Sequence, residues 1–72
     1  MADSPVSEVC QRAQVALASS PIYALRYLRV DRAGDTILIS GCVQSFYQKQ
    51  LAQELVRAVA EGIPVVNTVD VD

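Results

Sequence analysis

Residues 36–45, TILISGCVQS, decide the fold, because an apolar strand, a glycine near its end and a helix start follow one another directly. Every second position from Ile37 to Val43 is apolar or glycine, which is typical of a strand with one buried face. Gly41 leaves a gap in this row of bulky side chains, and we expect a helix backbone to approach closely there.

The residues after this stretch have the pattern of an amphipathic helix. Ser45 is a good N-cap, and Gln48 completes a capping box with it. Gly62 is placed to end the helix in left-handed geometry. The predicted buried stripe has the three- and four-residue spacing of a helix and consists of Tyr47, Leu51, Ala52, Leu55, Val56 and Val59.

The residues before the stretch predict a first strand and a tight turn. Residues 26–32 alternate with period two, which places Leu28 and Val30 on one face and Tyr27 and Arg29 on the other. Residues 32–35, RAGD, contain the glycine and aspartate that a tight turn needs. The two strands therefore form a predicted β-hairpin.

The two ends of the chain supply another helix and another strand. Ser4 and Pro5 suit a helix start, and residues 19–21, SSP, end the helix, so it covers about residues 5–18. Residues 65–71 alternate again and predict a last strand. The first helix buries one stripe, formed by Val6, Val9, Cys10, Ala13 and Leu17.

These elements predict one α+β domain over residues 1–72. The order is α-β-β-α-β, and we expect a two-layer sandwich with both helices on one face of a three-stranded sheet. The last strand lies either parallel beside the second strand or antiparallel beside the first, and a mixed sheet is favoured. The other sheet face is left open.

Composition argues against several classes of function. The chain has 72 residues, a net charge of −2 and no histidine, so it has neither a positive field for nucleic acid nor the commonest general base. We expect no enzyme activity, no metal and no cofactor. The start of the chain resembles no secretion signal and no stretch is long enough to cross a bilayer, so a cytoplasmic location is expected.

The two cysteines, Cys10 and Cys42, are too few for a disulfide framework. Cys10 belongs to the apolar stripe of the first helix, which favours a buried thiol over a reactive one. Cys42 is out of phase with Val43 and points to the open sheet face. A bridge between the two is therefore excluded on geometric grounds.

The hairpin, the strand with its Gly41, Val43 and Ser45, the alanine- and leucine-rich helix, and then Gly62 and Asn67 resemble the BON domain (bacterial OsmY and nodulation domain) family. The resemblance covers nearly the whole chain. It implies an α-β-β-α-β module without catalytic activity that binds phospholipid membranes or protein partners. Members of the family are often periplasmic or associated with the cell envelope.

We predict that the open sheet face contacts a partner. Its mixture of side chains is more apolar than a solvated sheet face usually shows, although scattered exposed apolar residues also occur without a function. The partner is another protein or a second copy, because an exposed strand edge favours pairing into a homodimer. The candidate contact residues are Tyr27, Arg29, Leu38, Ser40, Cys42, Val66 and Thr68.

An anionic phospholipid surface is the alternative partner. The segment at residues 22–25 either inserts into a membrane interface, with arginines nearby for lipid phosphates, or closes the end of the core. RNA binding is the weakest hypothesis, because the GxxG loop of KH-like folds is absent, and no nucleic-acid partner is expected. The candidate lipid contacts are Ile22, Tyr23, Leu25, Arg26 and Arg29.

Overall fold

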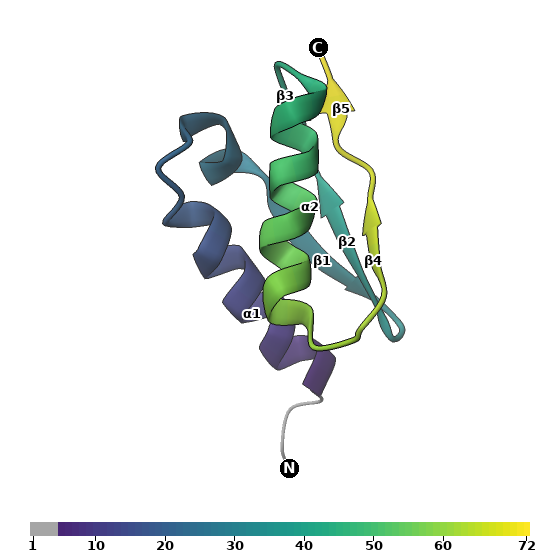
Figure 1. Cartoon of the computed structure of the whole chain (residues 1–72). Coiled ribbons are helices and arrows are strands. Elements are labelled where there is room, and N and C mark those ends of the chain that lie inside the picture. Colours follow the sequence, from purple (N-terminus) through teal and green to yellow (C-terminus); the bar gives the residue numbers. More distant parts are fainter. Residues whose placement is uncertain (1–4) are drawn as a thin grey trace.

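Two helices cover one face of a mixed β-sheet in this protein (Figure 1). The structure, a computed structural model, describes residues 5–72. The Ser4 cap predicted for the first helix lies outside these residues. The elements are α1 (Pro5–Ala18), the 3₁₀ helix η1 (Tyr23–Tyr27), β1 (Arg29–Ala33), β2 (Thr36–Ser40), β3 (Cys42–Val43), α2 (Phe46–Ala60), β4 (Val65–Asn67) and β5 (Asp70–Val71).

The sheet has the order β1-β2-β4 and confirms the predicted mixed α+β architecture. β1 pairs antiparallel with β2 through a hairpin whose two-residue loop begins at Gly34, where φ is +61°. β4 pairs parallel with β2, so the chain after α2 returns beside the second strand and not beside the first. The short strands β3 and β5 form a second parallel pair beyond Gly41.

The core lies between the two helices and the sheet face that carries Ile37 and Ile39, both fully buried. α1 contributes the predicted stripe, although Cys10 is only half-buried. Beside the core, α1 packs against α2 and lies along β1 (Figure 1). The other core side chains are Val6, Val9, Ala13, Leu17, Leu25, Leu28, Val43, Ala52, Val56, Ala60 and Val69.

The prediction of a strand over residues 26–32 is wrong at its start, since β1 begins only at Arg29. The preceding residues form η1, with hydrogen bonds from Leu25 N to Ile22 O and from Leu28 N to Leu25 O. Leu25 and Leu28 are three positions apart and both buried, which is the spacing of a 3₁₀ turn. Tyr27 therefore belongs to η1 and does not lie on the sheet.

Gly41 separates β2 from β3, and its close neighbour is different from the one expected. A Cβ atom at Gly41 would lie 2.7 Å from Leu28 Cδ2, and φ at Gly41 is +130°. The side chain that fills the gap is therefore Leu28, just before β1, and not a helix backbone. The strand bends here because only glycine adopts this φ without strain.

The start of α2 confirms the Ser45 N-cap, whose Oγ accepts a hydrogen bond from Gln48 N at 3.1 Å. The reciprocal bond runs to a different donor: Gln48 Oε1 accepts from Gln44 N at 2.8 Å. Tyr47 was predicted to be buried and is 71% exposed. In Figure 1 the first turn of α2 lies at the level of the short pair β3 and β5, beyond the three-stranded sheet that the rest of the helix covers.

The end of α2 and the last strand both depart from the simplest pattern. Glu61 is the left-handed C-cap, with φ of +53°, and Gly62 follows with a second positive φ of +87°. The strand predicted over residues 65–71 is divided into β4 and β5, and Figure 1 shows the chain bending between them. Val69 is buried, so the alternation of inward residues continues across the bend.

Candidate functional site

The 3₁₀ helix η1 is fixed in place by polar contacts to the residues that end α1. Ser20 is buried; its Oγ accepts a hydrogen bond from Ile22 N at 3.0 Å, and its carbonyl accepts one from Arg26 Nε at 2.8 Å. Leu25 is fully buried beneath the turn. These anchors leave Tyr23 and Tyr27 on the outer side of η1.

Tyr23 and Tyr27 form a pair on this outer side. Their rings meet edge to face with centroids 5.2 Å apart, and Tyr27 Oη donates a hydrogen bond of 2.7 Å to Tyr23 Oη. This hydrogen bond raises the pKa of Tyr27, desolvation adds to the rise, and nearby Arg26 opposes it. The Arg26 guanidinium also lies 5.6 Å from the centroid of the Tyr23 ring, a cation–π distance.

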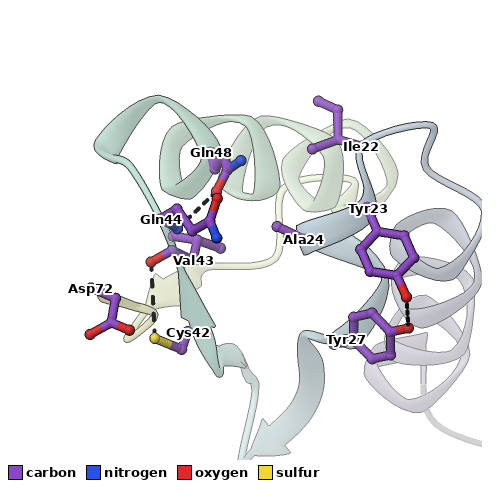
Figure 2. A pocket seen from close by; sticks show the side chains of 9 residues that line it. All are labelled: Ile22, Tyr23, Ala24, Tyr27, Cys42, Val43, Gln44, Gln48 and Asp72. Atoms are coloured by element: carbon purple, nitrogen blue, oxygen red, sulfur yellow. Dashed lines mark hydrogen bonds between the residues drawn. The ribbon is translucent and has the colours of Figure 1, made fainter.

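A cavity of about 400 Å³ opens beside the tyrosine pair (Figure 2). In Figure 2 the two tyrosines stand on one side of it, and residues from β3, the α2 N-terminus and the last described residue stand on the other. Its lining residues are Ile22, Tyr23, Ala24, Tyr27, Cys42, Val43, Gln44, Gln48 and Asp72.

All four aromatic residues of the chain lie at this end of the molecule. The chain has three tyrosines and one phenylalanine, and each is between 66% and 75% exposed. Tyr23 and Tyr27 are on η1, while Phe46 and Tyr47 are in the first turn of α2. We call these four residues the aromatic end; none of them contributes to the core.

The predicted lipid contacts do not all lie together on the surface. Ile22 and Tyr23 line the cavity, but Leu25 is fully buried, so its prediction as a surface contact is wrong and it closes the end of the core. Arg26 is exposed beside Tyr23, whereas Arg29 lies apart from them on the sheet.

The predicted open sheet face is present, without Tyr27. The register pairs Arg29 with Ser40 and Leu38 with Val66, so their side chains share one face. Val66 is 45% exposed and Leu38 half-buried. Two further predicted contacts lie beyond this sheet. Thr68, between β4 and β5, is exposed and donates a hydroxyl hydrogen bond to Ile39 O at 2.6 Å. Cys42, directly after Gly41, is exposed at the cavity wall.

The cysteines are both free. Cys10 is half-buried against β1, and its Sγ lies 3.7 Å from Asp31 O. Burial raises the pKa of the Cys10 thiol, with Arg32 opposing and Asp31 adding to the rise. A thiol in this environment carries less thiolate at neutral pH than a free one.

Asn67, predicted from the resemblance, joins three parts of the fold. Its Nδ2 donates to Lys49 O at 2.9 Å and to Gln53 Oε1 at 3.3 Å, and its Oδ1 accepts from Val69 N at 3.1 Å. The side chain therefore ties β4 to α2 and shapes the bend before β5. This is a structural role within the fold.

Sequence reasoning missed Gln14 and the cavity residues from the α2 start. Gln14 lies beside the apolar stripe of α1, and no local pattern distinguishes it from a solvated glutamine. Gln48 was noted only for capping, and Gln44 was not noted. The sequence feature that came closest to indicating this site was the placement of the aromatic residues. Of the four, only Tyr47 belongs to a predicted buried face.

Comparisons with protein-family models and with curated proteins found no match to this chain. The resemblance to the BON domain therefore stays a prediction. Within residues 5–72, no helix combines the length and apolar character that crossing a bilayer requires. No three potential metal ligands among His, Cys, Asp and Glu come together in this described part of the chain.

Proposed function

We propose that this domain is a non-catalytic protein-interaction module whose main contact surface is the aromatic end. The observation that carries the proposal is the exposure of all four aromatic residues at one end of the molecule, where Tyr23 and Tyr27 line a cavity. Tyrosine and phenylalanine bury large areas and dominate the energetics of protein interfaces. Because these four aromatic side chains do not contribute to the core, contact with a partner is the role that we assign to them.

The tyrosine pair is suited to such contacts because it is already ordered. The Tyr27–Tyr23 hydrogen bond and the Arg26 contact restrict the rings before a partner arrives. Side chains that are fixed in advance lose less conformational entropy on binding. The cavity beside them has room for part of a partner side chain.

A phospholipid surface is the second candidate, and it is favoured by the tyrosines with Arg26 beside them. Amphipathic rings with a neighbouring cation suit a lipid–water interface. The net charge of −2 opposes attraction to anionic lipids. Because Leu25 is buried, less apolar surface is available for insertion than the sequence suggested.

The test is a double variant, Tyr23→Ser with Tyr27→Ser, compared with Val15→Ser. Val15 is 64% exposed on α1, so its substitution removes a similarly exposed apolar side chain outside the aromatic end. The immobilised domain is used to capture partners from a lysate of the organism that makes it. We expect wild type and Val15→Ser to retain the same protein and the double variant to lose it.

Two further measurements separate the alternatives. Light-scattering mass at several concentrations reports self-association, and co-sedimentation with anionic vesicles reports lipid binding. Vesicle binding that disappears in the double variant supports the lipid candidate instead. If Leu38→Glu abolishes partner capture while the double variant retains it, the open sheet face and not the aromatic end is the contact surface.

A further inference from the structure

The two edges of the sheet differ, because α1 closes only one of them. Gln14 on α1 donates from Nε2 to Leu28 O and accepts at Oε1 from Val30 N, both at 2.9 Å. One side chain thus occupies the donor of Val30 in β1 and the acceptor of Leu28 just before this strand, both at its outer edge. Figure 1 shows α1 on this side of the sheet and β4 on the other.

The backbone of β4 presents hydrogen-bonding groups at the opposite edge. Pro64 O accepts from Ile37 N and Thr68 N donates to Ile39 O, both at 2.9 Å. At the even-numbered positions of β4 and its flanking residues, the backbone hydrogen-bonding groups therefore face β2. At Val65 and Asn67 the backbone N–H and C=O groups face outward, away from the sheet. Among residues 5–72, no backbone group of a helix or loop hydrogen-bonds to these outward groups.

Two positively charged residues of α2 lie on the helix face beside this edge. One face of α2 carries, at every fourth position, Lys49, Gln53 and Arg57. The hydrogen bonds from Asn67 to Lys49 O and Gln53 Oε1 place this face beside β4. Within residues 5–72, neither Lys49 nor Arg57 has an ion-pair partner, in contrast to Arg12.

Arg57 stands at a hollow beside the start of β4. This cavity, about 340 Å³, is lined by Gln53, Arg57, Gly62, Ile63, Pro64 and Val65. The carboxylate nearest in sequence, Glu54, is within 3.5 Å of Gln50 on the next face of the helix. The hollow therefore combines a cation, apolar side chains and the open strand edge.

We propose that the β4 edge binds an extended, acidic segment of a protein partner as an additional strand. The outward N–H and C=O groups of Val65 and Asn67 are two residues apart, a spacing that an extended chain matches. Lys49 and Arg57 favour negatively charged side chains on the side of that chain that faces α2. The surface lies apart from the tyrosine pair, so this inference goes beyond the proposed function and does not depend on it.

A second copy of this chain is a poorer occupant of the edge. A symmetric pair of β4 strands places both α2 helices on the same side of the joined sheet, since a two-fold interface brings the same patch of each copy together. Lys49 and Arg57 of one copy then face the same cations of the other. Like charges in this arrangement oppose the pairing.

The test is a titration of the ¹⁵N-labelled domain with a capped peptide that alternates valine and glutamate. We expect the amide signals of Val65 and Asn67 to shift and those of β1 to stay. The matched probes are the same peptide with lysine in place of glutamate, and with alternate backbone nitrogens methylated so that they cannot donate to β4. Neither is expected to bind.

Two charge reversals test the role of Arg57. Arg57→Glu is expected to weaken binding of the valine–glutamate peptide by roughly tenfold, the effect of about 1.4 kcal/mol. Arg29→Glu makes the same change of charge on the open sheet face and is expected to bind like wild type. Circular dichroism confirms that both variants are folded.

Any of four peptide results overturns the proposal: no shift with the valine–glutamate peptide, equal binding of the lysine peptide, equal binding of the methylated peptide, or wild-type binding by Arg57→Glu. A concentration-dependent dimer that the peptide dissociates shows that a second copy occupies the edge and also overturns it. Binding of the peptide to the Tyr23→Ser, Tyr27→Ser variant keeps this result separate from the test of the aromatic end.

Discussion

Replacing Gly41 by alanine tests the packing at the bend between β2 and β3. The added Cβ lies 2.7 Å from Leu28 Cδ2 and 3.5 Å from Leu28 Cα, at a φ of +130°. Holding an L-residue in such a backbone region costs ~1–3 kcal/mol, and forcing a methyl group against a packed side chain costs another ~1–3 kcal/mol. We therefore expect Gly41→Ala to reduce the free energy of unfolding by about 2–6 kcal/mol.

A loss of this size is large for a chain of 72 residues, whose total stability is expected to be roughly 4–11 kcal/mol. Leu28→Val separates the two costs, because valine has no Cδ atom, and alone it should cost about 1 kcal/mol. In the Leu28→Val background only the backbone cost of Gly41→Ala remains, so the two substitutions should show a coupling of about 1–3 kcal/mol.

Urea denaturation of the four proteins, followed by circular dichroism, measures this cycle. Two substitutions that are additive within about 0.5 kcal/mol would refute the contact between Leu28 and Gly41. If Gly41→Ala alone costs less than about 1 kcal/mol, the argument from backbone strain is refuted as well.

Three further predictions concern side chains elsewhere in the fold. Asn67→Ala removes the side-chain hydrogen bonds that join β4 to α2 and should lower the urea-derived stability by about 2 kcal/mol; a loss within error contradicts the structural role. Tyr23→Phe removes the acceptor for Tyr27 and should lower the pKa of Tyr27, measured from phenolate absorbance across alkaline pH; an unchanged or higher pKa contradicts this cause. Because burial raises the pKa of Cys10, a Cys42→Ser variant should be alkylated more slowly near neutral pH than a Cys10→Ser variant, and equal rates by mass spectrometry contradict this.

The helices and the hairpin were predictable because their patterns repeat over many residues. α1 matches the expected residues 5–18, and the turn at Gly34 joins β1 and β2 as the glycine indicated. The start of the hairpin was misjudged because Leu28 belongs to two spacings at once. It is two residues from Val30, which suggests a strand, and three from Leu25, which is the spacing that η1 adopts.

The candidate site was less predictable because it forms where three separate elements meet. Tyr47 has the spacing of the buried stripe on α2, but the stripe can be buried only where the sheet continues beneath it, and periodicity does not show where that ends. The cavity beside Tyr23 and Cys42 likewise depends on the bend at Gly41. Local patterns identify elements; they do not identify which ends of those elements meet.

The unequal edges of the sheet limit how the domain can assemble. A sheet with two open edges adds strands on both sides and risks growth into fibres. Here Gln14 occupies Val30 N of β1 and Leu28 O just before it, while Val65 and Asn67 leave the β4 edge accessible. The proposed strand addition is thus confined to the β4 side and stops after one partner segment, unless that segment itself continues the sheet. One closed edge and one open edge suit a discrete complex, whatever chain supplies the added strand.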